Sequence, residues 1–129
     1  MKHLSLDLSV LPGRWAVCRL PAEAPVPDWA LAGAWFSVTR TADELSIVCA
    51  EEAAPAVVAA ERGWRAVKVA GPLDFSLVGI LAALTGPLAL AGVSVFAVST
   101  YDTDYLLVKA AQLSAALEAW RAAGHQITE

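Results

Sequence analysis

The chain has 129 residues, of which 57% are hydrophobic and 17% charged, and its formal net charge is −4. Binding to nucleic-acid phosphates requires clustered lysine and arginine, and because no such cluster occurs, we expect no nucleic-acid partner. The apolar fraction exceeds the roughly 45–50% of typical soluble domains. This excess predicts that part of the apolar surface lies in an interface, and we expect a homodimer.

The first half of the chain begins with alternating leucines over residues 3–10. This period of two, followed by the turn Leu11–Pro12–Gly13, predicts a hairpin with a second strand over residues 14–20. Residues 21–33 are rich in proline and predict a loop that holds at most two helical turns.

A second hairpin is predicted from residues 35–41 and 45–50, which flank a short polar turn. The alanine-rich residues 51–62 then predict a helix, in which Pro55 occupies the first turn. Gly63 is expected to end this helix as its C-cap.

The second half opens with a predicted strand over residues 64–70 and a loop in which Asp74 is well placed to cap the next helix. One buried helical face is predicted from the spacing of the apolar side chains, with an interruption at Gly86–Pro87. Its members are Leu77, Ile80, Leu81, Leu84, Leu88 and Ala91.

The chain then continues with a third predicted hairpin, formed by residues 93–100 and 105–109. Residues 110–123 predict the last helix, and residues 126–128 can add a short final strand. The order of strands and helices is therefore βαββαβ, the ferredoxin-like pattern.

The hairpin segments are also related by an internal repeat, since Phe36 to Val48 aligns without a gap on Phe96 to Val108 at an offset of sixty residues. We therefore expect two copies of one unit. The first, residues 1–63, is divergent with a short first helix, and the second is residues 64–129.

The membrane alternative arises because no charged residue occurs between Asp74 and Asp102, a run longer than the roughly 20 apolar residues that cross a bilayer. Gly79, Gly86–Pro87 and Gly92 interrupt this run, so we expect no membrane partner. The N-terminus lacks the apolar core of a signal peptide, which favours a cytoplasmic protein.

Catalysis and metal binding find little support in the chain. Cys18 and Cys49 lie within apolar runs and are expected to be buried, inert thiols. His3 and His125 stand at opposite ends of the chain. No catalytic motif, phosphate loop or ligand spacing for a metal is present. We expect no enzyme, no catalytic residue, no metal and no cofactor.

The run GILAALTGPLALAGVSVFAVSTYDTDYLLV, residues 79–108, resembles the signature of ACT domains, in which a helix and a small turn lead into paired strands. It is similar to the regulatory ACT domains of aspartokinases and to the CASTOR-type amino-acid sensors. The resemblance implies an α+β fold with two ferredoxin-like (βαββαβ) ACT units in tandem, whose antiparallel sheets carry helices on one face. It also implies a regulatory module that binds an amino acid or a similar small effector.

A candidate site can be assembled from the second copy. The backbone at a helix start can hold a carboxylate, Gly92 leaves room for a ligand to approach, and the acidic hairpin turn can meet an ammonium or guanidinium group. The candidate ligand-binding residues are Asp74, Phe75, Ser76, Leu77, Val78, Gly92, Val93, Ser94, Ser99, Thr100, Tyr101, Asp102 and Asp104.

Each part of this site has a structural alternative. Asp74 can be a plain helix cap, Asp102 and Asp104 can belong to a solvated turn, and Gly92 can be a helix C-cap. If the site binds, an L-amino acid is expected, with lysine or arginine ahead of leucine or isoleucine. If it does not, the chain is a ligand-free module for protein–protein interaction.

Overall fold

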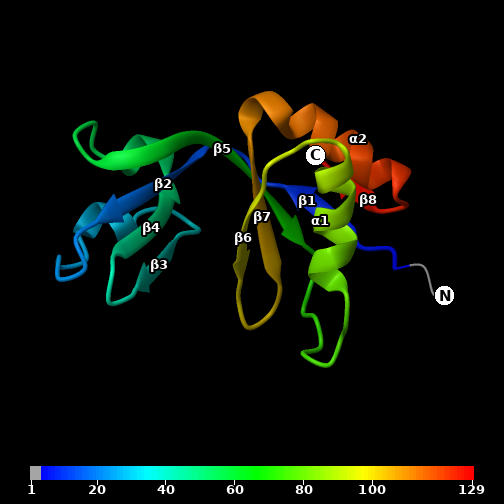
Figure 1. The fold of residues 1–129 in the computed structure, drawn as a ribbon, viewed down its shortest axis with the longest axis horizontal. Coiled ribbons are helices and arrows are strands. Elements are labelled where there is room, and N and C mark those ends of the chain that lie inside the picture. The colour runs from blue at the N-terminus through cyan, green and yellow to red at the C-terminus, as the bar shows by residue number, and fades with distance from the viewer. Residues whose placement is uncertain (1–3) are drawn as a thin grey trace. The chain divides into compact units, whose positions relative to one another are not determined.

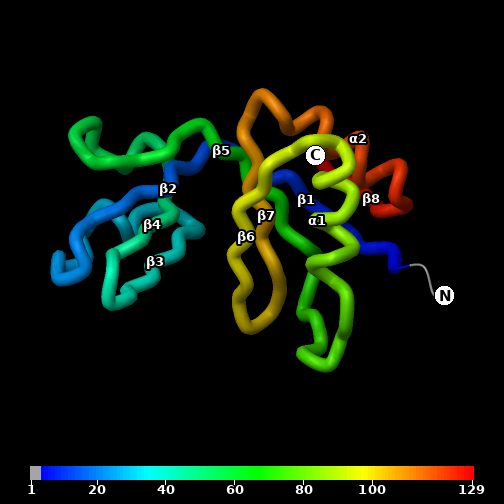
Figure 2. The backbone as a smooth tube through the Cα atoms, in the orientation of Figure 1, coloured from blue at the N-terminus to red at the C-terminus, as the bar shows by residue number. Residues whose placement is uncertain are grey.

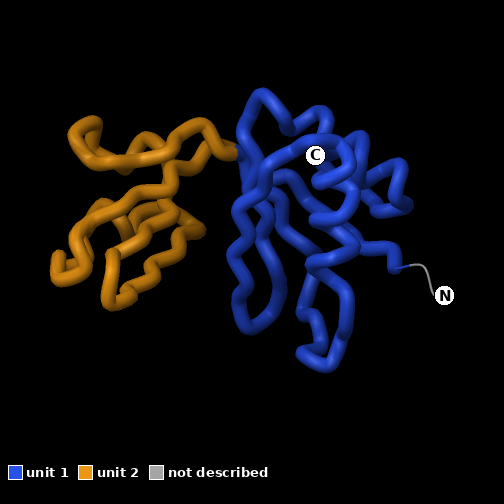
Figure 3. The backbone as a smooth tube through the Cα atoms, in the orientation of Figure 1, with its two compact units in different colours: residues 1–12, 65–129 blue, residues 13–64 orange. Residues whose placement is uncertain are grey.

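The computed structural model describes residues 4–129, which form two compact units (Figure 3). The smaller unit is residues 13–64, and the larger unit joins the N-terminal segment before it to residues 65–129. Strand β5 (Ala59–Val69) contributes its first part to the smaller unit and its last part to the larger one. The first strand of the chain therefore lies in the larger unit, which differs from the expected division after residue 63.

The smaller unit contains β2 (Trp15–Leu20), β3 (Ser37–Arg40) and β4 (Leu45–Ala50) together with the start of β5. Its strand order is β3-β4-β2-β5, and each neighbouring pair is antiparallel. The predicted hairpin of β3 and β4 is confirmed. The proline-rich loop holds one short 3-10 helix, η1 (Asp28–Leu31), also as expected.

A small apolar core fills this unit, and both cysteines belong to it, as predicted. Burial raises the pKa of both thiols, that of Cys49 to about 12. A thiol whose pKa is raised in this way stays protonated and is a poor nucleophile. The buried core residues are Ala16, Cys18, Ala30, Leu45, Ile47, Cys49 and Ala54. His3 lies outside the described residues.

The predicted hairpin between the first two strands is wrong. β1 (Asp7–Val10) pairs with the last residues of β5, while β2 pairs with its first residues, and both pairings are antiparallel. The turn at Leu11–Pro12–Gly13 therefore does not reverse the chain. It carries the chain from one part of β5 to the other.

The predicted helix over residues 51–62 is also wrong, since only the 3-10 turn η2 (Glu51–Ala53) forms before β5. The carboxylate of Glu51 accepts the Gly63 N–H at 2.6 Å. The guanidinium of Arg62 donates to the Pro55 carbonyl at 2.9 Å. These side chains bind backbone groups across the segment and hold it as a loop, which outweighs the helical propensity of its alanines.

Gly63 has a different role from the predicted helix cap. Trp15 opposes Trp64 while Val17 opposes Glu61, so β5 carries one extra residue at this point. Gly63 has φ 78, a left-handed conformation that suits glycine at a β-bulge.

The larger unit contains α1 (Ile80–Leu90), β6 (Phe96–Ser99), β7 (Asp104–Lys109), α2 (Leu113–Ala122) and β8 (Gln126–Thr128) (Figure 1). A short 3-10 turn, η3 (Ala110–Gln112), precedes α2. The strand order is β6-β7-β5-β1-β8. The third hairpin, the last helix and the final strand are confirmed. Figure 2 traces the same path as a tube.

The sheet of the larger unit is mixed, because β8 pairs with β1 in parallel. This corrects the expectation of purely antiparallel sheets. The physical reason is the insertion of the N-terminal strand between β5 and β8, which leaves β8 beside β1 and not beside the strand of its own repeat. The fold is α+β, and its sheet carries parallel and antiparallel pairs.

One core joins the sheet of the larger unit to both helices, and Trp120 is its largest fully buried side chain. Both helices bury apolar side chains in this cluster, so they cover the same face of the sheet, as predicted. The buried members are Leu6, Leu8, Val67, Val69, Ile80, Leu84, Leu88, Val93, Leu106, Val108, Ala116, Leu117 and Trp120.

Helix α1 is continuous through Pro87, which contradicts the predicted interruption. A proline inside a helix cannot donate to the carbonyl four residues before it, here that of Ala83. The His125 ring takes this place, with Nε2 at 3.2 Å from the Ala83 oxygen. Because His125 Nδ1 accepts the Leu6 N–H at 3.1 Å, Nε2 is the nitrogen that carries hydrogen and donates.

We therefore expect His125→Phe to lower the free energy of unfolding by about 1–3 kcal/mol, since it leaves the buried Leu6 N–H and the part-buried Ala83 carbonyl without this partner. Urea denaturation followed by circular dichroism measures the change. His125→Gln retains an acceptor and a donor and is expected to lose less. Equal losses in the two variants would contradict this account.

The internal repeat is present in the structure, but its register differs by one residue from the sequence alignment. β6 begins at Phe96 and η3 at Ala110, each 59 positions after the start of β3 at Ser37 and of η2 at Glu51. Three consecutive buried residues occur in β4 and again in β7. Such continuous apolar runs do not fix which side chain faces which side of the sheet, so the sequence pattern does not distinguish two registers that differ by one residue.

Candidate ligand-binding site

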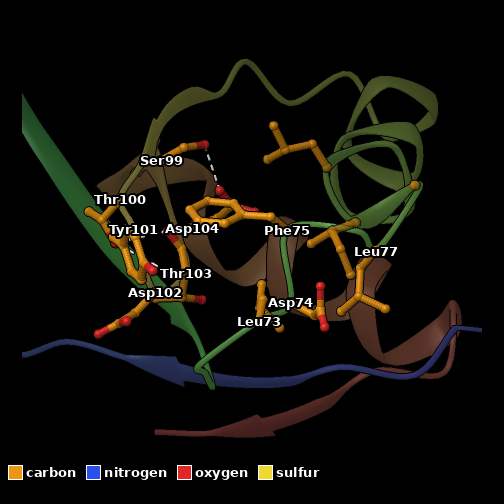
Figure 4. A pocket seen from close by; sticks show the side chains of 13 residues that line it. Leu73, Asp74, Phe75, Leu77, Ser99, Thr100, Tyr101, Asp102, Thr103 and Asp104 are labelled. Carbon is orange, nitrogen blue, oxygen red and sulfur yellow. Dashed lines mark hydrogen bonds between the residues drawn. The ribbon is translucent and has the colours of Figure 1, made fainter.

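A cavity of about 360 Å³ lies within the larger unit, between the segment that leads into α1 and the turn that joins β6 to β7 (Figure 4). Its size falls at the lower end of the range for small-molecule sites. The lining residues are Leu73, Asp74, Phe75, Leu77, Gly79, Ile80, Leu81, Ser99, Thr100, Tyr101, Asp102, Thr103 and Asp104.

The two walls of this cavity are tied together at the end of β5. The Leu73 N–H donates to the Asp102 carbonyl at 2.7 Å, and the hydroxyl of the buried Thr103 donates to the Val69 carbonyl at 2.6 Å. The backbones come close at Gly71, where a Cβ would lie 2.9 Å from the Asp102 oxygen. These contacts fix the hairpin turn against the segment before α1.

We expect Thr103→Val to destabilise the protein by about 1–3 kcal/mol, because the buried Val69 carbonyl loses this donor while the side-chain volume hardly changes. Thermal unfolding measures the loss. Thr128→Val, at an exposed position of β8, is the matched control and is expected to change stability by no more than about 0.5 kcal/mol. The interpretation fails if the two variants unfold alike.

The hairpin turn from Thr100 to Thr103 carries the acidic groups. The Thr100 N–H donates to the Thr103 carbonyl at 2.8 Å, and Ser99 Oγ donates to Asp104 Oδ1 at 2.5 Å. Asp104 is half-buried, whereas the Asp102 side chain is exposed. The turn therefore offers one oriented carboxylate and one free carboxylate.

Asp74 does not cap α1, which corrects its predicted role. Its Oδ1 accepts the Ser76 N–H at 2.8 Å, and this bond, with one from the Ser76 side chain, lowers the pKa of the Asp74 carboxyl. The helix begins six residues later, after Gly79, which has φ 84 and no side-chain cap. The start of α1 is thus open to the cavity that Gly79 and Ile80 line.

Two exposed aromatic side chains meet across the cavity. The Phe75 ring reaches from the segment before α1 toward the hairpin turn (Figure 4), and its centroid lies 4.9 Å from that of Tyr101 at an interplanar angle of 84°. Phe75 is 73% and Tyr101 81% exposed. The pair packs edge to face and leaves ring surface open to solvent.

The structure gathers most of the predicted site residues around this cavity. Those that line it are Asp74, Phe75, Leu77, Ser99, Thr100, Tyr101, Asp102 and Asp104. Ser76 and Val78 belong to the same segment but do not line the cavity.

Gly92, Val93 and Ser94 do not belong to the cavity either. They follow the C-terminus of α1, whose eleven residues span about 16 Å. Gly92 has φ 73, and its N–H donates to the Ala89 carbonyl at 3.2 Å. It is the left-handed residue that ends the helix directly after the C-cap Ala91, while Val93 is buried in the core.

The sequence did not predict several apolar residues that line the cavity, nor the Thr103 hydroxyl that fixes the hairpin turn. The spacing of the apolar side chains predicts a buried helix face that includes Ile80 and Leu81. It does not indicate that both residues also line the cavity. Thr103 was treated as a turn residue, although a threonine flanked by two aspartates at a strand start is a candidate anchor. The missed lining residues are Leu73, Gly79, Ile80, Leu81 and Thr103.

The cavity can hold a molecule with separated charges. Its only charged lining residues are Asp74, Asp102 and Asp104, which favour a cationic group. The first residues of α1 also line the cavity, and the first N–H groups of a helix have no partner within it, which favours a carboxylate. Leucine and isoleucine side chains also line the cavity.

Among residues 4–129, no helix is both long and apolar enough to cross a membrane. Over the same residues, no group of three or more His, Cys, Asp or Glu side chains is arranged to hold a metal ion.

The fold defines an α+β protein whose larger unit places two helices on one face of a mixed sheet. Residues 59–121 match the family model of the ACT domain, and residues 13–56 match a second model, that of an N-terminal domain. The chain is thus similar to ACT domains over slightly less than half of its length.

Among solved structures, the protein Atu0741 from Agrobacterium tumefaciens is 38% identical, with a TM-score of 0.92 over 97% of this chain and 93% of that one. The regulatory subunit of aspartate kinase from Thermus thermophilus is 14% identical, with a TM-score of 0.63 over 95% of this chain and 99% of that one. At such low identity, the second likeness shows the fold alone.

Among curated proteins, the chain is similar to the "Cytosolic arginine sensor for mTORC1 subunit 1" of Rattus norvegicus. The two are 39% identical over 56 residues, which are 43% of this chain and 17% of the rat protein. The chain thus matches less than a fifth of that relative's length.

Proposed function

We propose that this chain is a regulatory protein without catalytic activity, which binds an L-amino acid in the cavity of its larger unit. The observation that carries the proposal is the pairing of an acidic turn with an open helix start across one cavity of about 360 Å³. An ammonium group fits beside Asp104 and Asp102, and a carboxylate fits the backbone N–H groups at the start of α1.

A basic amino acid is the first choice of ligand. Lysine or arginine carries a second cation, and three carboxylates but no basic side chain line the cavity. The name of one relative supports this order, because the rat protein is an arginine sensor. Leucine and isoleucine come second, since Leu73, Leu77 and Ile80 also line the cavity.

Isothermal titration calorimetry with the common L-amino acids at millimolar concentration tests the proposal, using protein that has been unfolded, dialysed and refolded to remove any bound ligand. A true ligand also raises the melting temperature, because it binds the native state. We expect heat of binding and a thermal shift for lysine or arginine. Silence across the panel would defeat the proposal.

A ligand-free interaction module is the second candidate function. Phe75 and Val78 are 73% and 91% exposed beside the cavity, and exposed apolar clusters often mark contacts with other proteins. In this case the panel of amino acids gives no heat. A co-purifying protein is then lost when Val78 and Phe75 are replaced by serine.

The smaller unit is, in this proposal, a divergent second ACT unit, so that the chain contains two ferredoxin-like units. Its strand order β3-β4-β2-β5 is that of a ferredoxin-like sheet, and 3-10 turns stand where the two helices would be. It carries no counterpart of Tyr101, because the equivalent position is Ala42 at the offset of 59 residues. We therefore assign effector binding to the larger unit alone.

The proposal extends to assembly and location. We expect a homodimer, since apolar side chains such as Leu90 and Val78 remain exposed, and a cytoplasmic protein, as the name of the rat relative suggests. Sedimentation velocity that finds a monomer at all concentrations would refute the dimer.

A further inference from the structure

The carboxylates that line the cavity are limited as partners for a cationic group. Three carboxylates line it, and one oxygen of Asp104 is already engaged by Ser99. Asp74 and Asp102 are exposed, so water and salt screen their attraction for a cation. Carboxylates in this setting do not by themselves compensate for stripping water from a strongly hydrated primary ammonium group.

The Phe75 and Tyr101 rings can attract a cation in addition to the carboxylates. Aromatic faces attract cations through the ring quadrupole, and the attraction is strongest when the cation gives up its water easily. Guanidinium is more weakly hydrated than ammonium, and an N-methylated ammonium likewise presents methyl groups to the ring. The two rings line the same cavity as Asp102 and Asp104, so one cation can contact ring and carboxylate together.

We propose that this cavity selects its ligand by a weakly hydrated cation, a guanidinium or an N-methylated ammonium, held against the Phe75 and Tyr101 rings beside Asp102 and Asp104. The inference rests on the proposed binding of an amino acid in this cavity and adds the chemical basis of its selectivity. A primary ammonium binds the same place less tightly.

Calorimetric titration with four L-amino acids tests this selectivity: arginine, lysine, Nε-trimethyllysine and norleucine. Trimethyllysine keeps the charge of lysine but not its N–H donors, and norleucine keeps the chain length but not the charge. We expect arginine and trimethyllysine to bind about two to five times more tightly than lysine, and norleucine to bind most weakly.

Two variants locate the effect. In Phe75→Leu and Tyr101→Leu the ring faces are lost while apolar contact remains, so the ratio of trimethyllysine to lysine affinity is expected to fall to about one. Phe36→Leu, at a half-exposed ring of the smaller unit, is the matched control and leaves the ratio unchanged.

The outcomes separate the two proposals. If lysine binds as tightly as trimethyllysine, or norleucine binds more tightly than both, the inference about the cation fails while amino-acid binding stands. If the variants bind normally but retain the trimethyllysine preference, the rings are not its source and the inference also fails. No heat from any of the four, together with silence across the wider panel, defeats both.

Discussion

Replacing Trp120 by alanine is expected to lower the free energy of unfolding by about 3–5 kcal/mol. The indole is fully buried in the core of the larger unit, and its Nε1–H donates to the Leu84 carbonyl of α1 at 2.8 Å. The substitution therefore leaves a cavity beneath both helices and removes a hydrogen bond between them. Urea denaturation followed by far-ultraviolet circular dichroism measures the loss.

The control for this prediction lies on the same helix pair. Glu118 is an exposed residue of α2, so Glu118→Ala removes no buried contact and is expected to change stability by no more than about 0.5 kcal/mol. A loss below about 1 kcal/mol in Trp120→Ala would show that the helices are held mainly by other contacts.

Local chemistry made the hairpins of this fold predictable. Thr41 and Thr100 each begin a four-residue turn, and each backbone N–H donates to the carbonyl three residues on, at 2.9 and 2.8 Å. Strand-forming residues flank both turns. A turn and its two strands are adjacent in sequence, so the pattern contains all the information needed to predict them.

Pairings between distant segments were not predictable in the same way. The leucines of β1 predicted a strand but not its partners, which are β5 and β8. The alanines of residues 51–62 predicted a helix because the bonds from Glu51 and Arg62 that hold the loop have no signature in local propensity. Pro87 predicted a helix break because its compensating partner, His125, lies 38 positions later.

The candidate site shows the same division. The acidic turn and the segment from Asp74 to Leu77 were found because the residue types suit a zwitterion. A glycine such as Gly92 leaves room for a ligand, which predicts a role for residues 92–94, but they lie at the other end of α1. From the sequence, both ends of the helix are equally plausible parts of the site. Only the folded structure shows which end lies at the cavity.

Asp102→Ala is expected to weaken binding of the amino acid about two- to fivefold. The Asp102 side chain is exposed, so water and salt screen its attraction for a cation, and the contact contributes about 0.5–1 kcal/mol. Stability is expected to change little, because residue 102 contacts the segment before α1 through its backbone carbonyl, which accepts the Leu73 N–H. The substitution leaves this carbonyl in place. Titration of the variant with lysine and arginine, alongside its melting curve, measures both effects.

Asp43→Ala is the matched control, because Asp43 occupies the equivalent position in the turn of the smaller unit, 59 residues earlier. Its turn is closed by the same threonine contact, because Thr41 Oγ1 accepts the Glu44 N–H at 3.2 Å as Thr100 Oγ1 accepts the Thr103 N–H at 3.3 Å. The turn of the smaller unit has Ala42 in the place of Tyr101. Asp43→Ala is therefore expected to leave binding intact. Binding that is unchanged in Asp102→Ala and weakened in Asp43→Ala would move the effector site to the smaller unit, since the two substitutions remove the same group from equivalent turns.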